Sequence, residues 1–460
     1  MAELKVPQTI FRANDIRGNV NKELTPDVVH AIGLGLGSLA QENKVTKLII
    51  ARDGRLSSPV LAEALMQGLI ETGCDLIDIG AVPSPLLYFA TQALGVSSGV
   101  MITGSHNPAD DNGLKIVLNG EMLSEEQIQS IFKKIESKSF KQGKGKRQAA
   151  DIIPAYESKL ISDIKLKRKM RIVADAGNGI AGTVFPHLAR KLGAEVIELF
   201  SEVDGHFPNH FPDPALPKNL EDLIKKVQES GADAGVAFDS DGDRLGLVTN
   251  KGTIIESDRL LMLFAMQVLK DDPGAVIIYD VKCTRHLEKW IKDHKGAPLM
   301  WKTGHSLITL KMEETGAKLA GELSGHFYFK DRFFGFDDAL YAAARFLEIL
   351  SENSQSAEDL FSSIPSSVST PELKIEMADE KKFPFMDQFK KHAVFKGGKM
   401  NTLDGVRVDF DYGFGLVRPS NTTPSLVLRF EADTLDKLKA IKEMFREQLL
   451  AIDPGLTLSF

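Results

Sequence analysis

The sequence predicts an α/β protein with three related α/β domains built on mixed sheets, followed by a C-terminal α+β domain. Three observations lead to this prediction. The chain of 460 residues is longer than one core of about 100–200 residues requires. One unit of strand, loop, helix and strand occurs three times, starting near residues 47, 170 and 275. The last part of the chain instead combines alternating strands with one long helix.

The first unit begins with KLIIARD (47–53), a short apolar strand that ends in an acid. Ser58 and Pro59 are typical of a helix start, and Gly73 is typical of a helix end. A second apolar run, CDLIDIG (74–80), completes the unit. Parallel or mixed sheets need such a helical connection between neighbouring strands, so this unit favours an α/β fold.

The second and third units repeat this order. MRIVAD (170–175) leads through GNGIAG into a helix that ends at Gly193, and AVIIYD (275–280) leads into a helix that ends at Gly296. Open α/β sheets bind ligands beyond the carboxyl ends of their strands. We therefore expect the functional site near the acids that end the three first strands, which are Asp53, Asp175 and Asp280.

Polar segments separate the predicted domains. SKSFKQGKGKRQAA (137–150) has the composition of a solvated linker, and a Ser-rich stretch from Ser351 to Ser369 precedes the last segment. That segment contains the alternating run SLVLRFEA (425–432) and a helix from Leu435 to Leu450. The predicted domains are 1–150, 151–253, 254–367 and 368–460.

The composition is that of a globular protein rather than a binder of polyanions. Apolar residues make up 43% and charged residues 26%, and the net charge is −7, without the dense basic surface that nucleic acids require. Cys74 and Cys283 lie in apolar runs and are expected to be buried thiols in a reducing compartment. The first residues lack the apolar core of a signal peptide, and no apolar run reaches about 18 residues. We expect a cytoplasmic protein.

A serine stands in a loop of small, turn-forming residues. In VMITGSHNPADDNGLK (100–115), an apolar strand leads to Ser105, which His106 and Asn107 follow. A serine can receive and donate a phosphoryl group when a neighbouring base or metal activates it. A plain turn built from Thr, Gly, Ser, Asn and Pro is the other interpretation of this segment.

Three acids follow an apolar strand in AGVAFDSDGDR (234–244). The charges of Asp239, Asp241 and Asp243 would repel one another without a cation between them. Carboxylate oxygens in a compact loop are typical Mg²⁺ ligands, and Arg244 can contact a phosphate. The pattern is not that of an EF-hand, because its glycine comes too early. A phosphatase with Asp239 as nucleophile and a solvated acidic turn are the alternatives.

Two further segments have the side chains of a phosphosugar site. In GELSGHFYF (321–329), Glu322 and Ser324 would point the same way from an extended segment and could bind adjacent sugar hydroxyls. RPSNTTP (418–424) joins one arginine to hydroxyl and amide side chains, which suits a dianionic phosphate. The alternative for GELSGHFYF is a strand with a glycine kink, and the alternative for RPSNTTP is a polar turn. GLGLG (33–37) lacks the context of a nucleotide fingerprint and is expected to pack on a helix.

In this order the four motifs resemble the α-D-phosphohexomutase family, and most closely its bifunctional bacterial members, which act on mannose and glucose phosphates. The resemblance covers nearly the whole chain, from FRANDIRG (11–18) to the last helix. It implies four domains arranged around a central cleft. Further matching stretches are ARDGRLSSP (51–59), DAGNGIAG (175–182), DVKCTR (280–285) and FGFDDALYAAARFLEIL (334–350).

The resemblance implies a role for each matching residue. Ser105 would carry the phosphoryl group with His106 beside it, and Glu322 and Ser324 would bind the sugar hydroxyls. The Mg²⁺ ligands would be Ser105, Asp239, Asp241 and Asp243. The phosphate that is not transferred would contact Arg418, Ser420, Asn421 and Thr422. Further positions in the cleft are Arg17, Lys115, Arg244, Lys282, His305 and His326, of which Lys115 and His326 are the candidate acid/base groups.

The implied reaction is the reversible interconversion of hexose 1-phosphate and hexose 6-phosphate, with mannose, glucose or both as the sugar. It would proceed through phosphorylated Ser105 and a hexose 1,6-bisphosphate, with glucose 1,6-bisphosphate as activator. Such an isomerase would bind a phosphosugar but neither nucleic acid nor a membrane, and we expect a monomer.

Leu323 and Asn14 bear on which sugar is used, and Asp111 is a further departure from the family pattern. Phosphoglucosamine mutase is the alternative within the family, although Leu323 stands where those enzymes tend to have Gln. Asn14 replaces a common Tyr close to the expected sugar position, and Asp111 replaces a common aromatic residue. The aspartate-nucleophile phosphatase is the alternative from another class.

Overall fold

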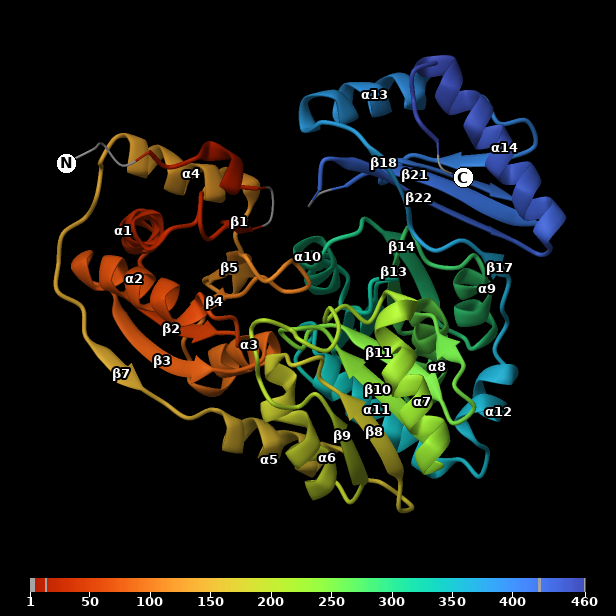
Figure 1. Cartoon of the computed structure of the whole chain (residues 1–460), viewed down its shortest axis with the longest axis horizontal. Coiled ribbons are helices and arrows are strands. Elements are labelled where there is room, and N and C mark those ends of the chain that lie inside the picture. Colours follow the sequence, from red (N-terminus) through yellow and green to blue (C-terminus); the bar gives the residue numbers. More distant parts are fainter. Residues whose placement is uncertain (1–4, 13–14, 421–422, 459) are drawn as a thin grey trace. The chain divides into compact units, whose positions relative to one another are not determined.

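The computed structural model of the chain describes residues 5–12, 15–420, 423–458 and 460 (Figure 1). It divides into two compact units. The first unit contains Met1–Ser257 and Ser324–Leu360, and the second contains Asp258–Leu323 and Phe361–Phe460. The four domain boundaries expected from the sequence stay predictions. Among the described residues, no helix has both the length and the apolar character needed to cross a membrane.

The first unit begins with a seven-stranded mixed sheet in the order β1-β5-β4-β2-β3-β7, with β6 paired to β5. The pairs among β4, β2, β3 and β7 are parallel, whereas β1 and β4 pair with β5 in antiparallel orientation. The strands are β1 (Ile16–Asn19), β2 (Lys47–Arg52), β3 (Asp75–Ala81), β4 (Gly99–Ile102), β5 (Asp111–Leu118), β6 (Glu121–Met122) and β7 (Arg147–Ala149).

Helices cover both faces of this sheet. One apolar cluster joins α1, α2 and α4 to Leu48 and Ile50 of β2. Ile49, between those two residues, is not part of the cluster and points to the other face, where Leu87 of α3 approaches Gly99. The helices are η1 (Gln8–Ile10), α1 (Pro26–Glu42), α2 (Ser58–Glu71), α3 (Ser84–Ala93) and α4 (Glu125–Glu136).

Glycines let α1 and α2 approach each other closely. A Cβ atom on Gly33 would lie 2.5 Å from the Leu65 carbonyl oxygen, and one on Gly68 would lie 2.4 Å from the His30 carbonyl oxygen. The expectation that GLGLG (33–37) packs on a helix is therefore confirmed.

This packing predicts the effect of Gly33→Ala. We expect the free energy of unfolding to fall by about 1–2 kcal/mol, because overpacking costs about 1–3 kcal/mol and the better helix propensity of alanine returns only about 1 kcal/mol. Urea unfolding followed by circular dichroism measures the change. Gly35→Ala on the same helix is the control, because its nearest neighbours are Ile131 atoms at 3.0 Å or more. Equal losses in both variants would contradict the prediction.

The second sheet of the first unit has five strands in the order β12-β11-β10-β8-β9. The strands β8, β9 and β10 are parallel, and β11 and β12 continue the sheet in antiparallel orientation. The strands are β8 (Arg171–Asp175), β9 (Glu195–Leu199), β10 (Ala234–Phe238), β11 (Leu245–Thr249) and β12 (Ile254–Ile255). The helical segments of this region are α5 (Ile153–Asp163), η2 (Ile180–Thr183), α6 (Phe185–Lys191), η3 (Pro217–Leu220) and α7 (Glu221–Ser230).

The returning segment of the first unit adds a short strand and a long buried helix. They are β16 (Phe327–Phe329) and α11 (Ala339–Glu352). The Asp338 carboxylate caps α11 by accepting the Tyr341 N–H at 2.9 Å, and it also accepts the Tyr156 hydroxyl at 2.8 Å. A shorter helix, α12 (Ala357–Ser362), follows.

The second unit contains a parallel three-strand arrangement and a separate antiparallel sheet. In the first, β13 (Val276–Asp280) pairs with β14 (Ala297–Trp301) and β15 (Leu319–Gly321). Its helices are α8 (Ser257–Asp271), α9 (His286–Asp293) and α10 (His305–Thr315).

The antiparallel sheet has the order β17-β22-β21-β20-β19, with β18 paired to β22. An apolar cluster packs α13 and α14 onto it, and Figure 1 shows both helices in blue beside the sheet. The strands are β17 (Val368–Ser369), β18 (Leu373–Glu376), β19 (Lys399–Asn401), β20 (Val406–Phe410), β21 (Gly413–Pro419) and β22 (Ser425–Ala432). The helices are α13 (Asp379–His392) and α14 (Leu435–Ile452). The predicted C-terminal α+β pattern is confirmed.

The three repeated units are also confirmed, because β2-α2-β3, β8-α6-β9 and β13-α9-β14 each join neighbouring parallel strands. The segment 137–150 is exposed over most of its length, as expected for a solvated linker, but it also pairs with the first sheet. Its end forms β7, and the Gly143 and Gly145 N–H groups donate to carbonyl oxygens of α2. A Cβ atom on Gly145 would lie 1.8 Å from the Cys74 carbonyl oxygen, so this glycine serves close packing.

Candidate active site

The carboxyl end of β4 delivers Ser105 into a buried position. Ser105 is 3% exposed, and its backbone N–H donates to the Thr103 hydroxyl at 2.8 Å. Its Oγ donates to Asp239 Oδ2 at 3.1 Å and lies 3.2 Å from His106 Nδ1. The Ser105 φ of +46° lies in the left-handed region, which is unfavourable for a residue with a side chain.

The carboxyl end of β10 delivers the three predicted metal-binding acids. Asp239, Asp241 and Asp243 are all buried, and Gly242 has the positive φ that the tight turn between them requires. Asp239 Oδ1 accepts the backbone N–H of Asp243 at 3.1 Å. Lys115 Nζ from β5 donates to Asp241 Oδ2 at 2.7 Å and forms a second ion pair with Asp243.

The charges of this cluster depend on one another. Burial and the two neighbouring carboxylates raise the pKa of Asp239 well above its usual value. Burial and Asp243 would also raise the pKa of Asp241, but Lys115 lowers it below the usual value. Burial would lower the pKa of Lys115, yet Asp241 and Asp243 raise it well above the usual value. Lys115 therefore balances two of the three acids, and Asp239 would ionise fully only beside more positive charge.

The donor set of this loop fits a hard divalent cation. The ligand oxygens of the three aspartates lie within 4.8 Å of one another. Asp241 Oδ1 and Asp243 Oδ1 are buried and accept no hydrogen bond from any described residue. Oxygen ligands from several carboxylates are what Mg²⁺ and similar ions prefer. The acidic cluster could thus hold a metal ion.

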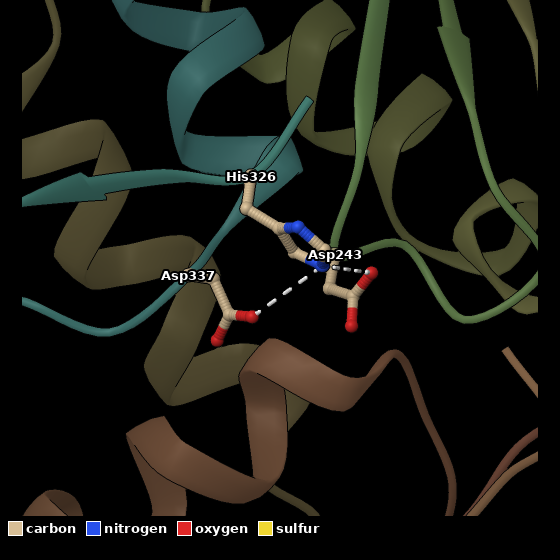
Figure 2. Close-up of side chains that lie close together, drawn as sticks. All are labelled: Asp243, His326 and Asp337. Carbon is tan, nitrogen blue, oxygen red and sulfur yellow. Dashed lines mark ion pairs between the residues drawn. The ribbon is translucent and has the colours of Figure 1, made fainter. Parts of the chain in front are cut away.

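His326 lies between two acids of the first unit, as Figure 2 shows. Its Nε2 is 3.4 Å from Asp243 Oδ1 and 3.9 Å from Asp337 Oδ2, and its Nδ1 is 3.0 Å from the Ser324 hydroxyl. Burial and the Asp243 charge raise the pKa of Asp337 to about 6. Asp243, His326 and Asp337 form a second group that could hold a metal ion.

The sequence reasoning missed Asp337. The matching stretch 334–350 contains two adjacent acids before a helix, and a helix cap explains only one of them. Asp338 is that cap, so capping does not explain Asp337, which could have been recognised as a candidate metal-binding acid.

Positive charge surrounds the serine loop. Arg17 donates to Asn107 Oδ1 at 2.8 Å and forms an ion pair with Asp15 at 2.8 Å. Burial, together with Arg244 and Arg17, lowers the pKa of His106 well below its usual value. This shift favours the neutral imidazole beside Ser105 Oγ. Such a group can accept a proton from the hydroxyl.

The expected extended geometry of GELSGH is wrong. Residues 322–326 form a turn after β15, in which Gly325 has a φ of +99°. A Cβ atom on Gly325 would lie 2.9 Å from the Leu245 carbonyl oxygen, so tertiary contact selects the turn. Glu322 and Ser324 consequently do not share one side of a strand. The Glu322 carboxylate instead accepts the Gly304 N–H at 3.0 Å.

In the second unit, Asp404 links the arginine of RPSNTTP to the loop before α10. Its Oδ2 accepts from Arg418 Nε at 2.9 Å and from the Thr303 N–H at 3.0 Å. His305 is the first residue of α10. Ser420 Oγ accepts the Thr423 N–H at 3.1 Å, which shapes the turn after β21.

Lys282 is also held by acids. Its Nζ lies 2.8 Å from Glu372 and 3.7 Å from Asp280, and Asp280 accepts the Thr303 hydroxyl at 2.8 Å. Burial would raise the pKa of Glu372, but Lys282 lowers it to about 2. Asp404 and Glu372 belong to no recognisable motif, so neither contact could be predicted from the sequence.

The predicted site residues thus fall into two sets. The first unit brings together Arg17, Ser105, His106, Lys115, Asp239, Asp241, Asp243, Arg244, Ser324 and His326. The second unit contains Lys282, His305, Glu322, Arg418 and Ser420. Asn421 and Thr422 lie outside the described residues. So does Asn14, the residue that replaces a common Tyr of the family.

Four family models match the chain in order. They describe the α/β/α domains I, II and III and the C-terminal domain of phosphoglucomutase/phosphomannomutase, and they match residues 8–142, 154–252, 256–368 and 372–448.

Known proteins are similar over almost the full length. A phosphomannomutase/phosphoglucomutase of Pseudomonas putida is 52% identical over 455 residues, covering 99% of this chain and 98% of that protein. A phosphoglucomutase of Neisseria meningitidis is 48% identical over 447 residues, covering 96% of each chain. A crystal structure of a phosphoglucomutase/phosphomannomutase family protein from Burkholderia thailandensis matches with a TM-score of 0.95 and 48% identity, covering 99% of this chain and 100% of that one. The chain therefore belongs to the phosphoglucomutase/phosphomannomutase family.

Proposed function

We propose that the chain is a phosphohexomutase that interconverts hexose 1-phosphate and hexose 6-phosphate, with mannose, glucose or both as the sugar. The observation that carries this proposal is the Ser105 hydroxyl, which donates to Asp239 within a buried cluster of three aspartates. Family membership supports the same reaction, as do relatives named phosphomannomutase/phosphoglucomutase.

The proposed reaction transfers a phosphoryl group twice. A hydroxyl oxygen of the hexose phosphate forms a bond to the phosphorus atom on Ser105 as the bond from phosphorus to Oγ breaks. The hydroxyl proton leaves to a base, and Ser105 Oγ takes up a proton. The resulting hexose 1,6-bisphosphate then returns its other phosphate to Ser105, which regenerates the phosphoenzyme and gives the isomeric product. Glucose 1,6-bisphosphate would therefore act as an activator.

Residues of the first unit supply the chemistry in this proposal. Mg²⁺ held by Asp239, Asp241 and Asp243 would neutralise charge on the transferring group. Lys115 would be an acid/base group that donates a proton, because Asp241 and Asp243 raise its pKa well above the usual value although burial opposes this. His326 is the alternative. His106, Arg17 and Arg244 would stabilise the phosphate on Ser105.

The proposal assigns substrate binding to the remaining predicted site residues. Glu322 and Ser324 would bind sugar hydroxyls, although the turn at 322–326 removes the extended geometry that suggested them. Lys282 and His305 would contact the substrate. The phosphate that is not transferred would contact Arg418, Ser420, Asn421 and Thr422.

The proposal also assigns one role to each predicted domain. The first would bear the phosphoserine, the second the metal, the third the sugar-binding residues and the fourth the phosphate-binding residues. We further propose a cytoplasmic monomer that binds neither nucleic acid nor membranes. The two buried cysteines, neither of which forms a disulfide, agree with a reducing compartment.

The first test measures the mass of the intact protein, with peptide mapping across Ser105, before and after incubation with glucose 1-phosphate. A mutase is expected to carry phosphate on Ser105, to lose it to the sugar and to form glucose 6-phosphate. Accumulation of inorganic phosphate without any modification of Ser105 would instead support a phosphatase with Asp239 as nucleophile. Repeating the assay with glucosamine 1-phosphate and mannose 1-phosphate separates the mutases within the family.

A further inference from the structure

The segment ARDGRLSSP (51–59) matches the family but has no role in the mechanism described so far. It follows β2, the strand parallel to β4, and it contains Arg55, whose side chain is fully buried. Taking a guanidinium group out of water is unfavourable unless its donors are satisfied, so the partners of this residue indicate its purpose.

Those partners are the backbone of the serine loop. Arg55 Nη2 donates to the carbonyl oxygens of Ser105 at 2.5 Å and Asn107 at 2.6 Å. Arg55 Nη1 donates to the carbonyl oxygens of Pro108 at 2.5 Å and Asp111 at 3.0 Å. One rigid guanidinium group therefore fixes four carbonyl groups within seven residues of chain.

Asp53 holds Arg55 and the start of the loop together. Its Oδ2 lies 3.4 Å from Arg55 Nε and also accepts the Gly104 N–H at 3.2 Å. Its Oδ1 accepts the Arg55 N–H at 3.0 Å and the Ser58 hydroxyl. A Cβ atom on Gly104 would lie 2.5 Å from Arg55 Cζ, so only glycine permits this approach. The acid that ends the first strand thus acts on the loop through Arg55.

The carbonyl group of Ser105 receives a second donor. Ser240 Oγ, from the loop of the three aspartates, donates to it at 2.5 Å. Ser105 has the unfavourable left-handed backbone conformation, and two strong donors on its carbonyl oxygen oppose relaxation to a common conformation. In this conformation Ser105 Oγ reaches both Asp239 and His106.

We propose that Arg55 is a positioning residue for phosphoryl transfer: together with Ser240 it holds Ser105 in the left-handed conformation that aims Oγ at the three-aspartate loop. This inference rests on the proposed function of Ser105. Arg55 is buried and bonds to backbone carbonyl groups, so its contribution is made through the loop and not by contact with the sugar. Its loss should therefore reduce the rate of transfer much more than substrate binding.

The test is a single-turnover measurement on Arg55→Lys. The unphosphorylated protein is mixed with glucose 1,6-bisphosphate at several concentrations, and the appearance of phosphate on Ser105 is followed by mass, which gives the rate constant of transfer and KM. The rate constant does not depend on how much protein is folded, whereas the amplitude does. We expect the rate constant to fall by about 100-fold, the effect of a displacement of about 1 Å, while KM changes by less than about threefold.

Arg345→Lys is the matched control. Arg345 is another buried arginine of the first unit, but it bonds to Asp331 and Tyr341 instead of the serine loop. This variant should lose stability and keep the wild-type rate constant. A wild-type rate constant in Arg55→Lys would overturn the positioning role.

If Arg55→Lys does not fold, Ser240→Ala tests whether the hydrogen bonds to the Ser105 carbonyl oxygen position Ser105 for transfer. It removes one of the two donors to the Ser105 carbonyl, and we expect a rate constant lower by about tenfold with KM almost unchanged. An unchanged rate constant would overturn the inference. If Ser105 of the wild-type protein takes up no phosphate, the proposed function itself fails, a result distinct from normal transfer in Arg55→Lys.

Discussion

Ser105→Ala is expected to lower the rate of hexose phosphate interconversion by about 10⁴-fold or more, as the loss of a covalent nucleophile does in other enzymes. The hydroxyl is the only part of this side chain that can carry a phosphoryl group. Its hydrogen bonds to Asp239 and His106 place it at the acidic cluster. A coupled assay that converts glucose 6-phosphate into a spectroscopic signal measures the loss.

Ser38→Ala is the control for this substitution. Ser38 is buried like Ser105, but it lies on α1, where its hydroxyl donates to the Leu34 carbonyl oxygen. That variant should keep nearly full turnover. Release of inorganic phosphate that persists in Ser105→Ala and is lost in Asp239→Ala would mean that Asp239 is the nucleophile and that the protein is a phosphatase.

The sequence alone predicted the elements that deliver the chemistry. Apolar runs that end in polar loops predicted β4 and β10, and the structure has Ser105 and the three aspartates directly after them. This worked because a buried strand and its loop are encoded by neighbouring residues. The same holds for the repeated units, whose strands and helices have local start and end signals.

The parts that escaped prediction depend on contacts between distant segments. Asp337 lies next to His326 and Asp243 only after folding, and these partners cannot be predicted from the residues around it in the sequence. The turn at 322–326 forms because Gly325 packs on Leu245, which overrides the extended pattern of the sequence. Arg55 could be recognised as part of a matching stretch, but its four carbonyl partners are not visible in any residue pattern.

The Asp241→Asn variant tests whether the three-aspartate loop binds the metal ion. This substitution keeps the size of the side chain but removes one of the three charges that would bind the cation. We expect turnover with Mg²⁺ to fall by about 10³-fold, because a bound metal contributes several kcal/mol of charge stabilisation in the transition state. Removing divalent ions from the wild-type protein with EDTA should stop turnover, and adding Mg²⁺ should restore it.

Thermal unfolding gives a second readout that does not require activity. Mg²⁺ should raise the unfolding midpoint of the wild-type protein, because it binds the folded cluster and offsets the burial and the carboxylate repulsion that raise the pKa of Asp239. Asp241→Asn should reduce this stabilisation, whereas Asp337→Asn should keep it, since Asp337 belongs to the other group around His326. The reverse pattern would place the metal between Asp243, His326 and Asp337. Lys115 alone would then balance the negative charge of the three-aspartate loop.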